Sequence, residues 1–489
     1  MSAVSRTMRF GAAVLFATLC LGLRTLVPDS PAPVRAATGS SASNGDLSVT
    51  SFGARGDGVT PDTDAIQAAV DALHPGQTLR FPKGIYLIET NKGVRLKDGT
   101  RLDLGESTLR GPNVDRTRCR IFEIQGRRDV QIRGGTLEGS RSGSPEWGVG
   151  ILASDAEDLV IENLTLRNFY FDGILLTGNR GCRRVAIRGV VAENNRRTGL
   201  AVVHAADVAV QGSTFRATRG QSPEAGVNCE PNSGEEVRGV RFHHCSFVKN
   251  GNVGLYAHRA LGLSVADLAV SDSVADDNGY GIIMSGVDGV TIESTHVARN
   301  HGRRASGIVF GEGTTKAVAK DNVLEDNSRG IFSAGATGVE IRSNTVVGSG
   351  AVSADGDAEA RDGIVCLGLR GVLTGACVVT VNIVRGWPGS GLVAQLVSRV
   401  ELRDNTVEDV GRRGVYLRGT SESEATGNSI SGTGQGEAGK HDAIEVDLSS
   451  RNNRIVENTI HRSAGMRNPV GIGSGCTGNV VDRNVVLPR

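Results

Sequence analysis

Residues 158–166 read DLVIENLTL, and three later stretches repeat their pattern: GVTIESTHV at 289–297, GVEIRSNTV at 338–346 and RVELRDNTV at 399–407. Apolar and polar side chains alternate in each stretch. A period of two is typical of a β-strand with one buried face. The sequence therefore predicts that one short strand is repeated along the chain.

A glycine followed by an aliphatic residue marks each repeated unit. This step returns at intervals of about 23 to 29 residues, with one interval of about 33. The step residues are Gly150, Gly173, Gly199, Gly226, Gly254, Gly281, Gly307, Gly330, Gly363, Gly391, Gly414, Ala443 as a degenerate member, and Gly471. The units lack the 3.6-residue period of amphipathic helices, so each is predicted to be a coil of short strands.

Asparagines keep the register of these units. One set follows the strand: Asn163, Asn322, Asn344, Asn405, Asn428 and Asn458. A second set precedes the next turn: Asn168, Asn250, Asn278, Asn300 and Asn327. Because amides stacked at equivalent bends can hydrogen-bond to one another, we expect columns of asparagine along the stack.

The predicted fold is all-β, a parallel β-helix solenoid. A single unit buries little apolar surface, whereas about a dozen or more stacked coils enclose a continuous aliphatic interior. Successive coils should lie about 4.8 Å apart. An open end of the stack would pair with other chains, so a capping helix is expected from Asp62 or Thr63 onward. Its buried face should hold Ile66, Ala69, Val70 and Leu73.

Composition bounds the location and the partners. The 489 residues carry a net charge of +1, which gives no electrostatic case for nucleic acid. Residues 1–37 have a basic start, an apolar run and small residues near Ala36, the pattern of a signal peptide. Residues 38–46 look like a flexible linker. We therefore expect a secreted protein, extracellular or periplasmic, with no stable membrane insertion after cleavage; a retained membrane anchor is the alternative.

The cysteines outside the signal segment are odd in number. They are Cys119, Cys182, Cys229, Cys245, Cys366, Cys377 and Cys476. Export permits disulfides, and at least one thiol should stay unpaired within the chain. No cysteine and histidine spacing indicates zinc.

The N-terminal segment carries a family resemblance. FGARGDGVTPDTDAIQAAVDA at 52–72, followed by FPKGIYLI at 81–88, resembles the N-terminal signature of the pectate-lyase-like superfamily. That superfamily includes polysaccharide lyases, glycoside hydrolases, alginate C5-epimerases and phage tailspikes. The resemblance implies a right-handed β-helix. Together with the repeat from Gly150 onward, we expect one domain at 47–489, with a cap at 47–75, first coils at 76–149 and regular coils at 150–489.

Aligning the units on their step residues reveals a candidate site. Positions one and three after the step are mainly aliphatic and should face inward, so positions two and four should face outward. Asn228 and Glu230 take the outward positions in one unit, and Tyr256 and His258 take them in the next. Single residues of these types on a sheet face are usually solvated. Their gathering on two adjacent coils favours a catalytic site.

These residue types fit β-elimination or C5-epimerisation of a uronic acid polymer. Both reactions need a group that neutralises the C5 carboxylate and a base that removes the C5 proton. We expect Asn228 and Arg259 to neutralise, His258 to act as the base and Tyr256 to protonate or relay. Glu230 would orient His258 and tune its charge.

Alginate C5-epimerases resemble this chain at the same bend, where they carry Gly-aromatic-Asp-Pro-His-Glu. The present chain has Asn228, Cys229 and Glu230 there.

Further residues are expected to bind the substrate. Arg259, His204, Glu224 and Tyr280 lie in the same or neighbouring units. A groove for uronic acid should be basic, and six arginines lie in these units or their loops: Arg196, Arg197, Arg219, Arg259, Arg303 and Arg304.

Two other functions stay open. A glycoside hydrolase needs two carboxylates about 5 Å or about 6.5 to 9.5 Å apart, and Glu230 could pair with Glu224 or Asp172. A non-catalytic sugar-binding, adhesive or structural β-helix is the third alternative. Three such helices could also associate side by side as a homotrimer.

A second acidic group lies in KHDAIEVD at 440–447. About eight coils separate it from Glu230, a distance of roughly 38 Å. Asp442, Glu445 and Asp447 could form a solvated edge, a calcium site or a separate catalytic pair. No metal or other cofactor is predicted with certainty, and calcium is the one cofactor that these residues could bind.

Overall fold

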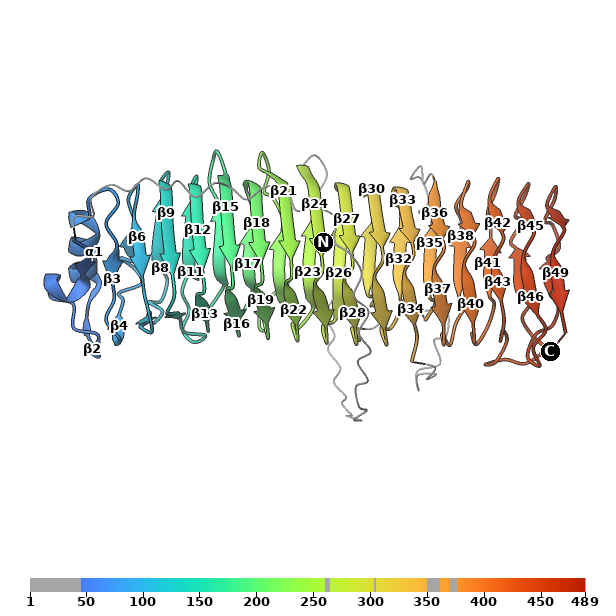
Figure 1. Cartoon of the computed structure of the whole chain (residues 1–489), viewed down its shortest axis with the longest axis horizontal. Coiled ribbons are helices and arrows are strands. Elements are labelled where there is room, and N and C mark those ends of the chain that lie inside the picture. The colour runs from blue at the N-terminus through green and yellow to red at the C-terminus, as the bar shows by residue number, and fades with distance from the viewer. Residues whose placement is uncertain (1–44, 260–263, 303–304, 350–360, 370–375, 489) are drawn as a thin grey trace. The chain divides into compact units, whose positions relative to one another are not determined.

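The computed structural model describes residues 45–259, 264–302, 305–349, 361–369 and 376–488. The predicted signal peptide lies outside the described residues, as does most of the predicted linker. Residues 350–360, in the long interval before Gly363, also lie outside them. The described chain forms a parallel β-solenoid of about 15 coils, whose strands lie side by side from α1 at one end to β49 at the other (Figure 1).

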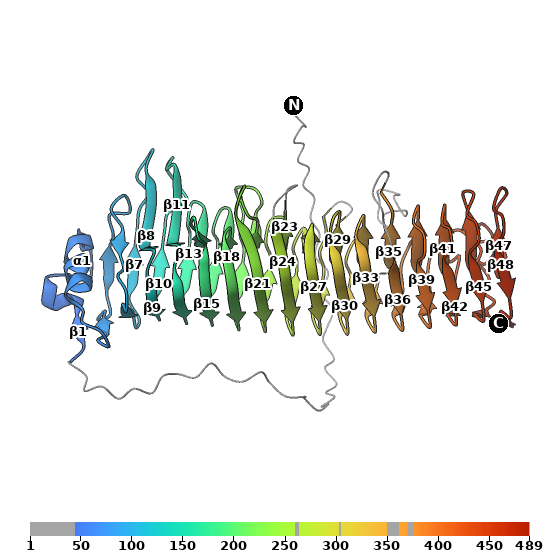
Figure 2. The same cartoon turned by 90° about the horizontal axis from the view of Figure 1, so that it is seen from above.

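Three parallel sheets, here named A, B and C, run the length of the stack. Sheet A has 17 strands and sheet C has 15. Figure 2 shows the same stack turned by 90°.

The strands of sheet A are β1 Leu47–Ser48, β3 Leu79–Arg80, β6 Arg101–Asp103, β9 Arg128–Arg133, β12 Glu157–Glu162, β15 Cys182–Arg188, β18 Ala205–Gln211, β21 Glu236–His243, β24 Ser264–Ser271, β27 Val287–Glu293, β30 Thr315–Lys320, β33 Thr337–Arg342, β36 Cys377–Thr380, β39 Glu401–Arg403, β42 Glu424–Thr426, β45 Arg454–Val456 and β48 Val480–Asp482. The strands of sheet B are β2 Asp57–Pro61, β4 Ile85–Leu87, β7 Thr108–Arg110, β10 Thr136–Glu138, β13 Thr165–Arg167, β16 Val191–Glu193, β19 Thr214–Arg216, β22 Ser246–Val248, β25 Val274–Asp276, β28 His296–Ala298, β31 Val323–Glu325, β34 Thr345–Val347, β37 Ile383–Arg385, β40 Thr406–Glu408, β43 Ser429–Ile430, β46 Thr459–His461 and β49 Val485–Leu487. The strands of sheet C are β5 Val94–Arg95, β8 Arg118–Gln125, β11 Trp147–Ser154, β14 Asp172–Thr177, β17 Thr198–Val202, β20 Ala225–Cys229, β23 Val253–His258, β26 Tyr280–Ser285, β29 Ile308–Gly311, β32 Ile331–Ala334, β35 Ile364–Leu367, β38 Leu392–Gln395, β41 Val415–Arg418, β44 Ile444–Asp447 and β47 Val470–Ile472.

The predicted repeat strand is divided into two. Within DLVIENLTL, β12 ends at Glu162, the chain bends at Asn163, and β13 begins at Thr165. Asn163 has a φ of 51°, a left-handed conformation that asparagine tolerates better than most residues. The bend carries the chain from sheet A to sheet B.

The Gly-aliphatic steps lie in sheet C and stay in register. Ile174 pairs with Leu200, Leu200 with Val227 and Val227 with Leu255, and all four side chains are buried. A Cβ added to Gly226 would lie 2.7 Å from the carbonyl oxygen of Gly254. The step therefore needs glycine at this position because a neighbouring backbone passes too close for a side chain.

Asparagine columns run along two bends, as predicted. In one column Asn250 donates to Asn278, and Asn278 donates to Asn300, through side-chain hydrogen bonds of 3.0 Å each. The other column contains Asn322, Asn344, Asn382, Asn405, Asn428, Asn458 and Asn484. The prediction was wrong for Asn163, which occupies the preceding left-handed position of the bend. Asn168 occupies a left-handed position too and lies outside the two columns, but its Oδ1 accepts a hydrogen bond of 2.7 Å from Asn194 on the next coil. Asn382 and Asn484 were not predicted.

The N-terminal cap is the helix α1, Thr63–Ala72, with Asp62 as its N-cap residue. The predicted inner face is confirmed, since Ile66, Ala69, Val70 and Leu73 are all buried. Further upstream, Val49–Phe52 is a 3-10 helix, because Ser48 Oγ accepts the amide of Thr50 and Gly53 closes the turn at a φ of 95°.

Most cysteines of the described residues are unpaired. Cys366 and Cys377 form a disulfide, whereas Cys119, Cys182, Cys229, Cys245 and Cys476 are free. Cys229 points into the core, and burial raises the pKa of its thiol to about 12. This thiol is therefore protonated at neutral pH.

Candidate functional site

The structure confirms the register that placed Asn228 beside Tyr256. The two residues pair across strands β20 and β23, with Ala201 on the other side of Asn228. His258, at the end of β23, pairs with Ser285 in β26. The outward positions of the two units are therefore neighbours in sheet C.

Four side chains meet at the C-terminal edge of these strands, and they are here called the Glu230 cluster: Asn228, Glu230, Tyr256 and His258. Glu230 follows β20 directly, and its Oε2 accepts a hydrogen bond of 3.0 Å from Asn228 Nδ2. Its other oxygen, Oε1, lies 3.9 Å from His258 Nδ1. The Tyr256 ring stacks on the His258 ring, with 5.6 Å between centroids. The two coils thus bring together a carboxylate, an imidazole and a phenol.

Asn228 is buried, although it was expected to face solvent. Only 3% of the residue is exposed, because Ala201 and Tyr256 flank it in the sheet and Glu230 covers its amide. Within the described residues its Oδ1 atom has no hydrogen-bond partner. Its donor is directed at Glu230, so the geometry favours a role in positioning that carboxylate.

Tyr256 is about half-buried between the neighbouring coils. Burial raises the pKa of its phenol, and the negative charge of Glu230 raises that pKa further. The phenol therefore carries its proton at neutral pH, as a general acid must.

Arg259 and His204 extend this edge in the two directions of the stack. The Arg259 side chain passes so close to Gly286 that a Cβ there would clash with it. His204 lies one coil below Glu230, and its Nδ1 is 2.7 Å from the carbonyl oxygen of Gly178. Both residues follow strands of sheet C, at the same edge as Glu230.

Glu224 and Tyr280 lie at the other edge of sheet C, so their expected place beside the cluster was wrong. Glu224 precedes β20 and its Oε1 accepts the amide of Gly220, whereas Glu230 follows that strand. Six residues of extended chain separate the two backbones by about 20 Å. Tyr280 begins β26 in the same way.

The same geometry separates the carboxylate pairs considered for hydrolysis. Glu224 is too far from Glu230 for either stereochemical class of glycosidase. Asp172 begins β14, two strands away from β20 in sheet C. It is buried and accepts hydrogen bonds from Arg197 and Thr198. Neither predicted pair can flank one glycosidic bond.

The predicted basic groove is divided between two edges. Arg197 pairs with Asp172, and Arg196 lies over the ring of Tyr170 at 4.0 Å, both at the start of sheet C strands. Arg219 precedes β20 at that edge, and Arg259 lies at the opposite one. Residues 303 and 304 lie outside the described residues.

The second acidic group is a buried ion-pair network. Asp442 is fully buried and accepts two hydrogen bonds from Arg467. Glu445 is only 9% exposed and pairs with Arg413, with 2.9 Å between Oε2 and Nε and 3.0 Å between Oε1 and Nη2. The solvated-edge interpretation was therefore wrong for these two residues. Asp447 is partly exposed, and its Oδ1 accepts the amide of Leu448.

Sequence reasoning missed the partners of this network. Arg413 lies over the Tyr416 ring at 4.0 Å, and His441 approaches Glu437 and Glu445. Burial lowers the pKa of His441, and the charge of Arg413 lowers it further. Arg413 and Asp442 both directly precede a step residue, so alignment at that position would have revealed the network.

The described residues contain no group of three or more histidine, cysteine, aspartate or glutamate residues that could hold a metal ion. None of their helices has the length and apolar character needed to cross a membrane.

Two family models match the chain. One, described as right handed beta helix region, matches residues 88–265, 221–365 and 362–487. The other, described as rhamnogalacturonase A/epimerase, pectate lyase-like, matches residues 47–116. The second range contains the N-terminal signature.

Similar proteins include two curated relatives. Uncharacterized protein YclG of Bacillus subtilis (strain 168) is 23% identical over 273 residues, 49% of this chain and 45% of that protein. Alginate lyase 7 of Azotobacter vinelandii is 30% identical over 112 residues, 22% of this chain and 12% of that protein. The chain therefore spans less than half the length of either relative.

A similar solved structure is the A-module of mannuronan C-5 epimerase AlgE6 from Azotobacter vinelandii. It is 17% identical, with 89% of this chain and 100% of that chain covered, and the TM-score is 0.44.

Proposed function

The chain belongs to the right-handed beta helix family, and we propose that it is a secreted enzyme acting on a uronic-acid-containing polysaccharide. The reaction begins with removal of the C5 proton and ends in β-elimination or in epimerisation at C5. The observation that carries this proposal is the meeting of Glu230, Tyr256 and His258 on two successive coils. The match to the pectate lyase-like model and the short similarity to an alginate lyase support it.

His258 is the proposed base. A neutral imidazole can take up a proton near neutral pH, and a nearby carboxylate stabilises the imidazolium that results. Glu230 supplies that carboxylate at 3.9 Å. Asn228 holds Glu230 from the other side and is therefore proposed as a positioning residue.

The remaining groups complete the reaction. Breaking the C5–H bond leaves negative charge on C5 and its carboxylate, and the guanidinium of Arg259 is proposed to stabilise that charge. In elimination the C5 electron pair forms the C4–C5 double bond, the bond from C4 to the glycosidic oxygen breaks, and Tyr256 protonates the departing oxygen. In epimerisation C5 receives a proton on its opposite face.

Product analysis tests the proposal. The purified secreted protein is incubated with polymannuronate, polygalacturonate and a neutral glucan. Unsaturated-product absorbance, reducing ends and C5 configuration are then followed. Unsaturated ends or altered C5 configuration on a uronic polymer support the proposal. New reducing ends without unsaturation would instead indicate a hydrolase, and binding without any product would indicate a non-catalytic protein.

A further inference from the structure

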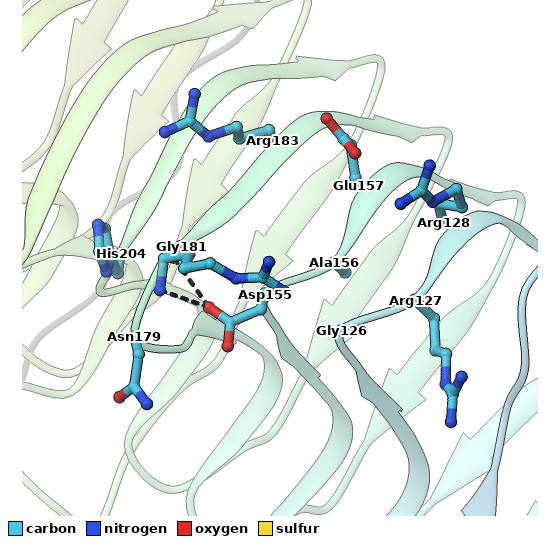
Figure 3. Close-up of a pocket in the computed structure, with 11 residues that line it drawn as sticks. Gly126, Arg127, Arg128, Asp155, Ala156, Glu157, Asn179, Gly181, Arg183 and His204 are labelled. Carbon is cyan, nitrogen blue, oxygen red and sulfur yellow. Dashed lines mark hydrogen bonds between the residues drawn. The ribbon is translucent and has the colours of Figure 1, made fainter.

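A pocket of about 510 Å³ lies on the same edge of the solenoid as Glu230, toward the N-terminal end of the stack. Arg127, Arg128, Arg180, Arg183 and His204 line it, together with the carboxylates of Asp155 and Glu157. Figure 3 shows Arg127 and Arg128 on one side of Asp155, and Arg183 and His204 on the other. Side chains from four successive coils of the stack therefore surround one hollow.

Both carboxylates of the pocket are already engaged. Asp155 Oδ1 accepts the backbone amides of Arg180 and Gly181 at 2.6 and 3.0 Å, which fixes the turn at 178–181 (Figure 3). Glu157 pairs at 2.6 Å with Arg184, which does not line the pocket. Because of these contacts, neither carboxylate of the pocket wall pairs with a lining arginine.

Many arginines of the solenoid pair with a carboxylate, and the four lining arginines differ from these. Arg110, Arg188 and Arg216 each pair with a glutamate of an adjacent coil at 2.8 Å or less. In the part of the chain that the structure describes, the side chains of the four pocket arginines form no such ion pair. Guanidinium groups bind carboxylate and sulfate oxygens through paired hydrogen bonds, so an unpaired group of four favours an anionic ligand.

The backbone of the pocket is built for close contact. A Cβ on Gly181 would lie 2.6 Å from the His204 ring, so glycine lets that ring rest against the turn. The Nδ1 atom of His204 is already bonded to the carbonyl of Gly178, which holds the ring in place.

The pocket adjoins the Glu230 cluster along the stack. Cys229 pairs with Val202, two residues before His204, so His204 and Glu230 follow neighbouring strands at one edge. Four coil steps separate the turn after β8 from the turn after β20, a distance of about 19 Å. An extended polysaccharide lying along this edge would reach both places.

We propose that this arginine pocket binds the anionic groups of a polysaccharide segment several sugar units away from the reacting bond. The inference rests on the proposed function in one respect, because the distance of the pocket from the reacting sugar unit depends on where the reaction takes place. The preference of the pocket for anions is argued from the pocket residues alone. The bound groups are carboxylates of uronic acids or sulfate esters, which share the same oxyanion chemistry.

The test compares two triple variants of the full secreted chain. Arg127→Ala/Arg180→Ala/Arg183→Ala removes three pocket arginines, and Arg110→Ala/Arg188→Ala/Arg216→Ala removes three paired ones as a charge-matched control. Both carry Glu230→Gln so that the polymer is not consumed. Binding of polymannuronate, dextran sulfate and neutral dextran is measured by calorimetry at constant salt.

We expect the pocket variant to bind an anionic polymer at least about tenfold more weakly and the control variant to change less than about twofold. If the pocket prefers polymannuronate, the bound groups are carboxylates; if it prefers dextran sulfate, they are sulfate esters. Equal losses in the two variants, or no loss in the pocket variant, would overturn the proposal.

Turnover separates this inference from the proposed function. With Glu230 intact, the pocket variant should raise KM for long polymers and leave kcat and short oligomers unaffected. If no substrate is turned over but the binding difference persists, the pocket stands and the proposed reaction fails. If turnover is present and KM for long polymers is unchanged, the pocket assignment fails.

Discussion

Glu230 Oε1 and His258 Nδ1 lie 3.9 Å apart on successive coils, although 28 residues separate them in the chain. The separation places a carboxylate beside an imidazole without a direct hydrogen bond. Parallel pairing of β20 with β23 produces this relationship, because the outward positions of the two strands stack on one another.

Asn228 should affect the rate more than substrate binding. In Asn228→Ala the Glu230 carboxylate loses the hydrogen bond that orients it. A bond to a charged group contributes about 1.5 to 3 kcal/mol, so kcat should fall by about ten- to hundredfold with little change in KM. A change in KM alone, with kcat unaltered, would argue against the positioning role.

The asparagine columns should contribute strongly to stability. Asn405→Ala removes the acceptor of two Asn382 hydrogen bonds and the donor to the Val379 carbonyl, all of them buried. Each buried polar group left unpaired costs about 1 to 3 kcal/mol, so the total loss should be about 3 kcal/mol or more. Urea unfolding followed by circular dichroism measures the loss. Asn179→Ala, at an exposed position, serves as the control and should be nearly neutral.

The sequence predicted the coils and the register because both depend on local patterns. The alternation in DLVIENLTL and the regular step glycines determine which residues face inward and which coils are neighbours. The sequence predicted less well which polar side chains are buried and which residues they contact. The exposed fraction of Asn228 depends on Ala201 and Tyr256, and that of Glu445 on Arg413. These contacts come from other coils, so the residue's own segment carries no signal for them.

Asp362 should make stability depend on pH. Burial raises the pKa of this carboxyl to about 6, although Arg329, Arg412 and Arg413 oppose the shift and Ser390 donates a backbone hydrogen bond. Its unfolded pKa is near 3.8. Between these values the folded chain binds more protons, so this contribution to stability is full below about pH 4 and is lost as the pH rises through about 6.

The matching variant is Asp362→Asn, which keeps an oxygen acceptor for Ser390. It should be more stable than the wild type at pH 7, by up to about 3 kcal/mol, and nearly equal to it at pH 4. Unfolding midpoints at several pH values measure this difference. A variant that loses stability at pH 7 would show that the ionised carboxylate is favoured by its arginine neighbours.

The buried network near the C-terminal end should matter for stability and not for the reaction at Glu230. Glu445→Gln breaks the paired contact with Arg413, and removing one partner of a buried ion pair costs about 3 to 5 kcal/mol. The unfolding temperature should fall. At a temperature where the variant is folded, kcat on the uronic polymer should stay within about twofold of the wild type. Loss of activity in the folded variant would instead place a catalytic group in this network.

The most direct test of the central claim compares two glutamate–histidine pairs of the solenoid. Glu230→Gln and His258→Ala change the proposed reacting pair, whereas Glu325→Gln and His296→Ala change a similar pair, 3.1 Å apart, on sheet B. The measurement is the initial rate of unsaturated-product formation or C5 inversion on the uronic polymer. Our account predicts a loss of about 100-fold or more in both variants of the first pair and less than about twofold in the second. Activity retained in Glu230→Gln and His258→Ala, with the fold intact by circular dichroism, would contradict it.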